Sequence, residues 1–129
     1  MFRDTKAFSS FSVNDIQKAK QFYGETLGLE IKETKEGLAL KIAGGGDVFL
    51  YSKPNHQPAS FTVLNFPVEN IDNGVAQLNQ LGITFEHYDY AGLKTDDDGI
   101  LRSTGDDGGP NIAWFKDPAG NILSILEEN

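Results

Sequence analysis

The stretch FSVNDIQKAKQFYGETLGLEI, residues 11–31, carries the signals of a strand end followed by an amphipathic helix. Phe11 and Val13 alternate as they would in a strand, and Asn14 is a residue type that caps helix N-termini. Apolar residues then recur at helical spacing, and Gly28 stands where a left-handed C-cap residue is expected. The stretch therefore predicts a strand that leads into a helix, with the helix ending just before Gly28.

The same pattern occurs a second time in FPVENIDNGVAQLNQLGITF, residues 66–85. Asn70 again offers a helix cap, and Gly28 corresponds to Gly82 at a spacing of 54 residues. A repeat of this length is too long for a small solenoid unit. It predicts two copies of one supersecondary module within a single domain.

Strand-like segments with alternating apolar residues follow each predicted helix. They are residues 29–34, 38–42 and 47–52 in the first half, and residues 84–90, 111–116 and 122–126 in the second. The chain is thus predicted to be one α+β domain, residues 1–129, with βαβββ modules at about residues 5–53 and 59–129 and a connector at about 53–59. Both faces of DVFLYS, residues 47–52, are apolar, so we expect curled mixed sheets around a central cavity.

The C-terminal stretch FKDPAGNILSILEEN, residues 115–129, predicts a hairpin. Asp117, Pro118 and Gly120 fit the positions of a type I turn. Ser124 then stands between apolar neighbours on one face of the strand that follows. Either this hydroxyl faces a cavity, or it hydrogen-bonds to backbone in a filled core.

The segment AGLKTDDDGILRSTGDDGGP, residues 91–110, contains five Gly and five Asp and has no sustained period. Long irregular segments in compact domains are either functional lids or mobile loops, and both interpretations stay open here. The run Asp96-Asp97-Asp98-Gly99 lacks the alternating ligand spacing and the bidentate Glu of a calcium loop. We therefore interpret its carboxylates as solvated loop charge.

The composition excludes several classes of site and partner. Cysteine is absent, which removes disulfides, thiolate metal ligands and cysteine nucleophiles, and favours the cytoplasm as the location. Eleven Lys and Arg against 19 Asp and Glu give a net charge of -8, which repels nucleic acid and anionic lipid. No stretch approaches the roughly 20 apolar residues of a membrane span. We expect a soluble protein whose acidic surface either favours a cationic ligand or serves solubility alone.

The whole chain resembles the vicinal oxygen chelate superfamily, which includes glyoxalase I, extradiol dioxygenases, fosfomycin-resistance enzymes and bleomycin-resistance proteins. The resemblance rests on SVNDIQKAKQFYGETLGLEI, residues 12–31, and WFKDPAGNILSILEEN, residues 114–129. It implies paired βαβββ modules around a cavity and a homodimer, in which relatives sometimes exchange modules. In metal-using members, the resemblance further implies, four cavity-facing strand positions supply His and Glu ligands to one divalent metal.

Counted from these motifs, the four ligand positions of the family fall on Phe8, Phe49, Val63 and Ser124, the second and third within about two residues. Divalent metals need carboxylate oxygen or imidazole nitrogen, and these side chains offer at most one neutral hydroxyl. We therefore expect neither a metal of the family type nor another cofactor. Ser124 then stands where a metal-using relative places a glutamate.

Strand parity adds further residues that we expect to line the cavity. Aromatic walls with a few hydroxyl and amide groups are typical of small-molecule pockets, although a packed core uses the same residues. Tyr88 and Trp114, beside the long loop, are placed to close one end. The predicted ligand-binding residues are Phe8, Ser10, Phe49, Tyr51, Phe61, Val63, Asn65, Tyr88, Trp114 and Ser124, with Ser12 on the face of Phe8 and Ser10.

Histidine is the usual general base, but neither histidine is assigned a catalytic role. His56 lies in the Pro-containing connector and is predicted to be an exposed linker residue. His87 alternates with Phe85 and is predicted to be a partly exposed strand residue. No catalytic residue is predicted from the sequence.

Three functional hypotheses follow from these observations and the resemblance. The leading one is a metal-free protein that binds a small aromatic or cationic molecule, most simply to sequester it. The second is a glyoxalase-like lyase or isomerase, or a dioxygenase-related enzyme, with atypical groups such as His87, Asp47 or Glu127. The third is a dimeric module without a ligand of its own.

Overall fold

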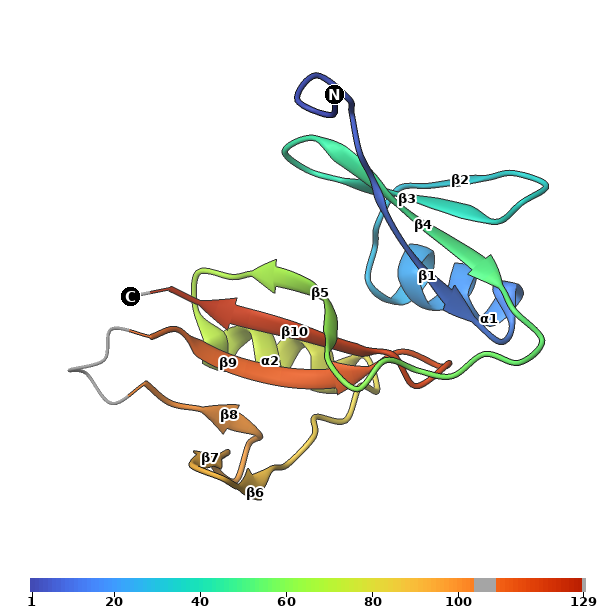
Figure 1. Cartoon of the computed structure of the whole chain (residues 1–129). Coiled ribbons are helices and arrows are strands. Elements are labelled where there is room, and N and C mark those ends of the chain that lie inside the picture. Colours follow the sequence, from blue (N-terminus) through green and yellow to red (C-terminus); the bar gives the residue numbers. More distant parts are fainter. Residues whose placement is uncertain (104–108, 129) are drawn as a thin grey trace. The chain divides into compact units, whose positions relative to one another are not determined.

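The computed structural model describes residues 1–103 and 109–128. They form two compact units, and the boundary along the chain lies between Pro58 and Ala59. Each unit contains one four-stranded mixed sheet and one helical segment (Figure 1). The predicted α+β class is thereby confirmed. No helix in these residues is long and apolar enough to cross a membrane.

The first unit has the predicted order of one strand, one helix and three strands. Its sheet has the order β1-β4-β3-β2, in which β1 is parallel to β4 and the other pairs are antiparallel. The elements are β1 (Ser9–Val13), α1 (Ile16–Lys20), the π-helical turn η1 (Gln21–Thr26), β2 (Ile31–Glu33), β3 (Leu38–Ile42) and β4 (Gly46–Ser52).

The first helix begins one residue later than predicted. Asp15, not Asn14, is the N-cap, and its Oδ1 accepts hydrogen bonds from the backbone N–H groups of Gln17 (3.0 Å) and Lys18 (3.1 Å). An ionised carboxylate is the stronger acceptor and also suits the positive end of the helix dipole. The predicted C-cap is confirmed, because Gly28 has a φ of 77° just after the helix.

The helix of the first unit covers one face of its sheet. Tyr23 is fully buried, and its ring contacts the ring of Phe11 edge-on, with centroids 6.3 Å apart. Because side chains alternate along a strand, the register places one apolar set under the helix and leaves the other face open. The buried apolar residues of this unit are Val13, Ala19, Tyr23, Leu38, Leu40 and Leu50.

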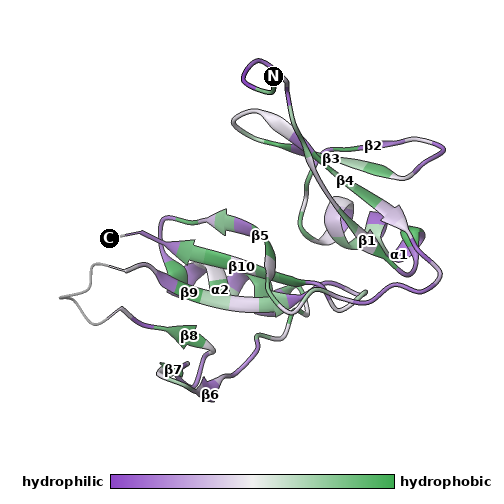
Figure 2. Cartoon of the chain, viewed as in Figure 1, coloured by the Kyte–Doolittle hydropathy of each residue, from purple (hydrophilic) through white to green (hydrophobic). Residues whose placement is uncertain are grey.

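The second unit contains one helix and a mixed sheet of order β5-β10-β9-β8, with β5 parallel to β10. Figure 2 shows hydrophobic residues along β8 and β10 of this sheet. The elements are β5 (Thr62–Pro67), α2 (Ile71–Gln80), β6 (Asp89–Tyr90), β7 (Leu93–Lys94), β8 (Ile100–Leu101), β9 (Asn111–Lys116) and β10 (Ile122–Glu127).

The core of the second unit lies between α2 and the β9-β10 hairpin (Figure 1). The predicted cap of α2 is confirmed, since Asn70 Oδ1 accepts from Asn73 N–H at 2.9 Å. The predicted turn is confirmed too, because Gly120 N–H donates to Asp117 O at 3.0 Å. The buried apolar residues here are Ile71, Val75, Ile83, Phe85, Ile100, Ala113, Phe115, Leu123 and Ile125.

The predicted continuous strand at residues 84–90 is wrong. Beyond one bridge from Phe85 to Phe115, the chain turns back on itself, because Thr95 N–H donates to Tyr88 O and Tyr88 N–H donates to Thr95 Oγ1, both at 2.9 Å. The fourth strand of the sheet is instead β8, within the segment that the sequence predicts to be irregular. Residues 104–108 of that segment lie outside the described residues.

Candidate functional site

The open face of the first-unit sheet carries several of the predicted ligand-binding residues. The register pairs Ser10 with Phe49 and Ser12 with Tyr51, and it pairs Phe49 with Ala39 on the other side. These side chains therefore lie on the face opposite the helix. Tyr51 is 36% exposed, which is more than a core role requires.

A groove on the first unit brings together Phe8 and Phe49, two of the four positions where the family resemblance implies metal ligands. We call it the first-unit groove; its volume is about 690 Å³. Its rim at Gly45 and Gly46 is low, since a Cβ added to either glycine would meet no atom within 4 Å. The groove is lined by Thr5, Lys6, Ala7, Phe8, Ala39, Gly45, Gly46, Asp47 and Phe49.

The groove is built by two segments that the strand pairing of β1 and β4 holds together. Residues 5–8 run into β1, and Asp47 and Phe49 belong to β4, which pairs with β1 in parallel. Lys41 on β3 binds Asp47 with Nζ and Oδ2 2.9 Å apart, which neutralises the one carboxylate in the lining. Phe8 itself is 68% exposed, so its ring is a wall of the groove and not part of the core.

His56 is not the exposed linker residue that the sequence predicts. It is half-buried, and its Nδ1 lies 2.6 Å from Ser12 Oγ, a hydrogen-bonding distance. Lys53 N–H also donates to Val13 O at 3.0 Å, so the first part of the connector is held along β1. Sequence reasoning missed this contact because 44 residues separate the two side chains.

In the second unit, the predicted residues Tyr88 and Trp114 belong to one aromatic cluster. The Trp114 ring contacts Tyr88 edge-on with centroids 5.5 Å apart, and Tyr88 contacts Tyr90 in the same way at 6.1 Å. Trp114 Nε1 donates to Thr62 Oγ1 at 3.1 Å. Burial, followed by the charge of Glu86, raises the pKa of the Tyr88 hydroxyl.

Strand parity failed along β5. The register of β5 against β10 shifts between Ile122 and Leu123, so strict alternation along β5 does not hold. Thr62, which was not predicted to line a site, contacts Trp114 instead. Phe61 precedes the strand and is 66% exposed. A bulge of this kind leaves no signal in the apolar pattern, which explains why the sequence did not indicate Thr62.

Ser124 makes a contact that neither interpretation of the sequence included. It is fully buried, and its Oγ donates to Asn65 Oδ1 at 2.5 Å. The partner is a side-chain amide on the neighbouring strand β5, not backbone. The hydroxyl therefore cross-links β10 to β5.

Solved structures resemble the chain over nearly its whole length. TnmS3, an antibiotic binding protein from Streptomyces sp. CB03234, is 22% identical with a TM-score of 0.67, covering 100% of this chain and 99% of that one. A glyoxalase family protein from Enterococcus faecalis is 26% identical with a TM-score of 0.67, covering 98% and 100%. A superfamily member from Sphaerobacter thermophilus DSM 20745 is 22% identical with a TM-score of 0.71, covering 99% and 100%. No curated protein matches significantly.

The model of the Glyoxalase/Bleomycin resistance protein/Dioxygenase superfamily matches residues 8–125, which is most of the chain. The chain belongs to this superfamily. The resemblance inferred from the two motifs is thereby confirmed, as is the fold that it implied. Among these relatives, the antibiotic binding protein and the glyoxalase family protein carry different functional descriptions, so the fold alone does not assign the function.

The superfamily's metal does not fit the residues present. Phe8 and Phe49 in the first unit have no donor atom, and in the second unit Val63 has none while the Ser124 hydroxyl is bonded to Asn65. Residues 1–103 and 109–128 contain no group of three or more His, Cys, Asp or Glu able to hold a metal. No step of a mechanism is therefore assigned to a metal.

The alternative groups considered for an enzyme are each engaged elsewhere. Asp47 is paired with Lys41, and His87 Nε2 lies 3.1 Å from Asp97 O. Glu127 Oε2 accepts from Ile71 N–H at 2.6 Å, at the N-terminus of α2. Each of the three groups has its own partner in the described part of the chain, and none of these contacts joins two of them.

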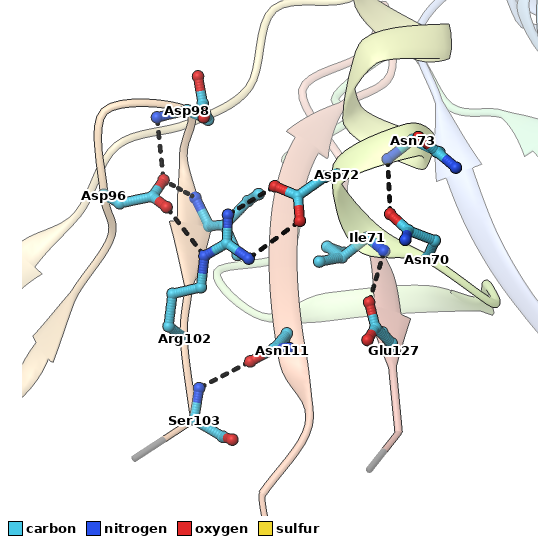
Figure 3. Close-up of polar contacts among 11 residues, drawn as sticks. Asn70, Ile71, Asp72, Asn73, Asp96, Asp98, Arg102, Ser103, Asn111 and Glu127 are labelled. Atoms are coloured by element: carbon cyan, nitrogen blue, oxygen red, sulfur yellow. Dashed lines mark hydrogen bonds and ion pairs between the residues drawn. The ribbon is translucent and has the colours of Figure 1, made fainter. Parts of the chain in front are cut away.

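The segment after Tyr90 is anchored to α2 by Arg102 (Figure 3). Its guanidinium binds Asp72 Oδ1 and Oδ2 at 2.6 and 3.2 Å, and its Nε binds Asp96 Oδ2 at 3.1 Å. Asp96 Oδ1 also accepts the N–H groups of Asp98 and Ile100, both at 2.9 Å. Asp96 is therefore a structural acceptor and not the solvated loop charge that the sequence predicts.

These contacts lower the pKa values of both carboxyl groups. For Asp72 the largest cause is the hydrogen bond from Arg102. For Asp96, burial alone raises the pKa, but the hydrogen bonds from Ile100 N–H, Arg102 and Asp98 N–H together lower it overall. A folded-state pKa below the unfolded value contributes stability that is present above the unfolded pKa and is lost as the pH falls through the folded one.

Arg102→Gln is accordingly expected to destabilise the protein in a pH-dependent way. At pH 7 we expect the Tm to fall by roughly 2–4 °C, because exposed ion pairs contribute little individually. The difference should shrink as the pH falls below 3.8, the ordinary Asp value, and through the lowered pKa values of Asp72 and Asp96. Thermal melts over a series of falling pH values test this, with Arg3→Gln as a control for net charge. A Tm difference that stays constant over the whole series would contradict it.

Proposed function

We propose that this superfamily member binds a small aromatic molecule, without a metal, and sequesters it unchanged. The observation that carries the proposal is the first-unit groove, with about 690 Å³ of volume between Phe8 and Phe49. Ligand sites are typically hollows of roughly 300–1,000 Å³ with aromatic walls and a few polar groups. A binding role needs walls and a few polar groups, and the lining of this groove supplies both.

The exposure of Phe8 supports an occupant for this groove. Its side chain is 68% exposed, so core packing does not account for a large apolar residue at this position. A planar ligand that lies against the Phe8 and Phe49 rings removes this apolar surface from water, at about 25 cal/mol per Å². The structural neighbour TnmS3 is an antibiotic binding protein, which favours the same kind of role here.

The cellular setting that we propose follows from the sequence and the family. We propose a homodimer, since the superfamily resemblance implies one, and a cytoplasmic location, since cysteine is absent. The partner is a small organic molecule and not nucleic acid, because the chain carries a net charge of -8.

The proposal is tested by measuring the Tm of the protein with each compound of an aromatic panel, since any ligand that prefers the folded state raises the Tm. Phe8→Ala is expected to weaken binding of a hit about tenfold, because an aromatic anchor of a pocket is lost, while the unliganded Tm stays nearly unchanged. Phe2→Ala is the matched control, as Phe2 is 74% exposed and lies outside the groove. No hit in the panel, or equal affinity for the Phe8 variant, would contradict the proposed function.

A further inference from the structure

We propose that the ligand of the first-unit groove is an aromatic compound with an anionic group such as a carboxylate, and that Lys6 recognises this charge. The inference rests on the proposed function and adds the chemical class of the ligand. It is carried by the distribution of charge between the two units and by the ion pairs along the groove.

The acidic character of the chain belongs to one unit. Residues 1–58 contain eight Lys and Arg against seven Asp and Glu, whereas residues 59–129 contain three against twelve. The net charge of -8 is thus the sum of a first unit at +1 and a second at -9. The preference for a cationic ligand that the total charge suggests does not apply to a groove made by the first unit alone.

One positively charged side chain in the lining of the groove has no opposite charge paired with it among the described residues. Its lining contains one acid, Asp47, and one base, Lys6. Asp47 is already bound by Lys41, with Nζ and Oδ2 2.9 Å apart. Lys6, in contrast, makes no ion pair with any residue in the described ranges. An anion that enters the groove therefore finds an available ammonium and a neutralised carboxylate.

The open face beside the groove keeps this excess of one positive charge. Lys32 pairs in register with Ala39, and Ala39 pairs with Phe49, so these three residues share the face that holds the groove. Glu30 lies opposite Lys41, whose N–H donates to Glu30 O at 2.9 Å, and it shares this face too. The face then carries three Lys, at positions 6, 32 and 41, against two acids, Glu30 and Asp47. Because salt screens exposed charges beyond about 8–10 Å, these nearby groups decide the local potential more than the total charge does.

The positions of Lys6 and Phe8 favour a ligand with a ring and one charged substituent. Lys6 and Phe8 both line the groove, although Ala7 N–H donates to Thr5 O at 3.1 Å and the chain therefore makes a tight turn at Lys6 before β1 begins. An ammonium is a compact point charge on a flexible stem, and so it accepts a single anionic group without the planar geometry that Arg imposes. A ring against Phe8 and Phe49 then places its substituent within reach of Lys6.

Three probes with one ring system test the inference: 2-naphthoate, 2-naphthalenemethanol and 2-naphthylmethylammonium, which carry charges of about -1, 0 and +1 at neutral pH. Titrations are followed by the backbone amide NMR signals of residues 5–7 and 45–47, which border the groove. We expect 2-naphthoate to bind about three- to fivefold more tightly than the alcohol, and the ammonium compound to bind most weakly. The preference should decrease as salt is added.

Variants of Lys6 assign the preference to this side chain. Lys6→Gln is expected to weaken 2-naphthoate about three- to fivefold and to leave the alcohol unchanged, and Lys6→Glu is expected to reverse the order of the charged probes. Lys35→Gln removes the same charge from the turn at the opposite end of β3 and is expected to change nothing. Both lysines are exposed, so neither substitution threatens the fold.

The outcomes separate the inference from the function on which it rests. If the probes shift the groove amides with equal affinity, or if Lys6→Gln affects all three alike, the inference is overturned and the binding function stands. If no probe shifts these amides, the proposed function is overturned and the inference falls with it. Selective loss of 2-naphthoate binding in Lys6→Gln supports both.

Discussion

Gly37→Ala is expected to lower the free energy of unfolding by at least about 3 kcal/mol, which exceeds the usual cost of overpacking. An added Cβ would lie 2.0 Å from the carbonyl oxygen of Leu50 and 3.1 Å from Cζ of Phe49. The oxygen cannot move aside, because Leu50 is fully buried and lies on β4, between β1 and β3 in the sheet. Gly37 also has a φ of 157°, which L-residues rarely adopt.

Urea denaturation of wild type and variant measures this effect. Gly46→Ala is the matched control, since its Cβ would meet no atom within 4 Å and its φ is not in the positive range. We expect the control to stay within about 0.5 kcal/mol of wild type. A Gly37 variant within about 1 kcal/mol of wild type would show that β3 and β4 separate more easily than their pairing implies.

Asp117→Ala is expected to cost about 3 kcal/mol, because the turn between β9 and β10 depends on one buried carboxylate. Asp117 is 4% exposed, and its Oδ1 accepts the N–H groups of Ala119 and Asn121, both at 2.9 Å. Its Oδ2 accepts from Asn121 Nδ2 at 3.1 Å. Removal leaves three donors without this acceptor, and a buried unsatisfied donor costs roughly 1–3 kcal/mol.

A milder variant and a control make the Asp117 prediction specific. Asp117→Asn keeps one acceptor oxygen but presents an amide N–H₂ group toward a donor, so we expect roughly half the cost. Asp98→Ala makes the same change at an exposed carboxylate and should alter the free energy of unfolding by less than about 0.5 kcal/mol. Equal midpoints for Asp117→Ala and Asp98→Ala in urea would contradict the role assigned to this turn.

Local signals were sufficient to predict most of the elements. The C-cap at Gly28, the N-cap at Asn70 and the turn at Asp117 each involve hydrogen bonds between residues at most a few positions apart. The sequence repeat predicted two copies of one module, and the structure has two four-stranded mixed sheets with matching strand order. These features depend on φ preferences and side-chain caps, which act within one turn of chain.

Strand assignments failed where two partners competed for the same backbone. Residues 84–90 have a suitable alternating pattern, but Thr95 takes the backbone hydrogen bonds of Tyr88, and β8 becomes the edge strand. Apolar alternation is equally compatible with either partner, because it records which side chains are buried and not which strand supplies the hydrogen bonds.

By itself, the sequence determined the superfamily and the α+β class. Tertiary structure alone decided which side chains meet: Ser12 with His56 across 44 residues, and Ser124 with Asn65 across 59. It also decided that Asp47 is neutralised while Lys6 remains available in the groove. Periodicity and capping are local properties of the chain, whereas contacts and local potential depend on strand register, which is set when distant segments pack together.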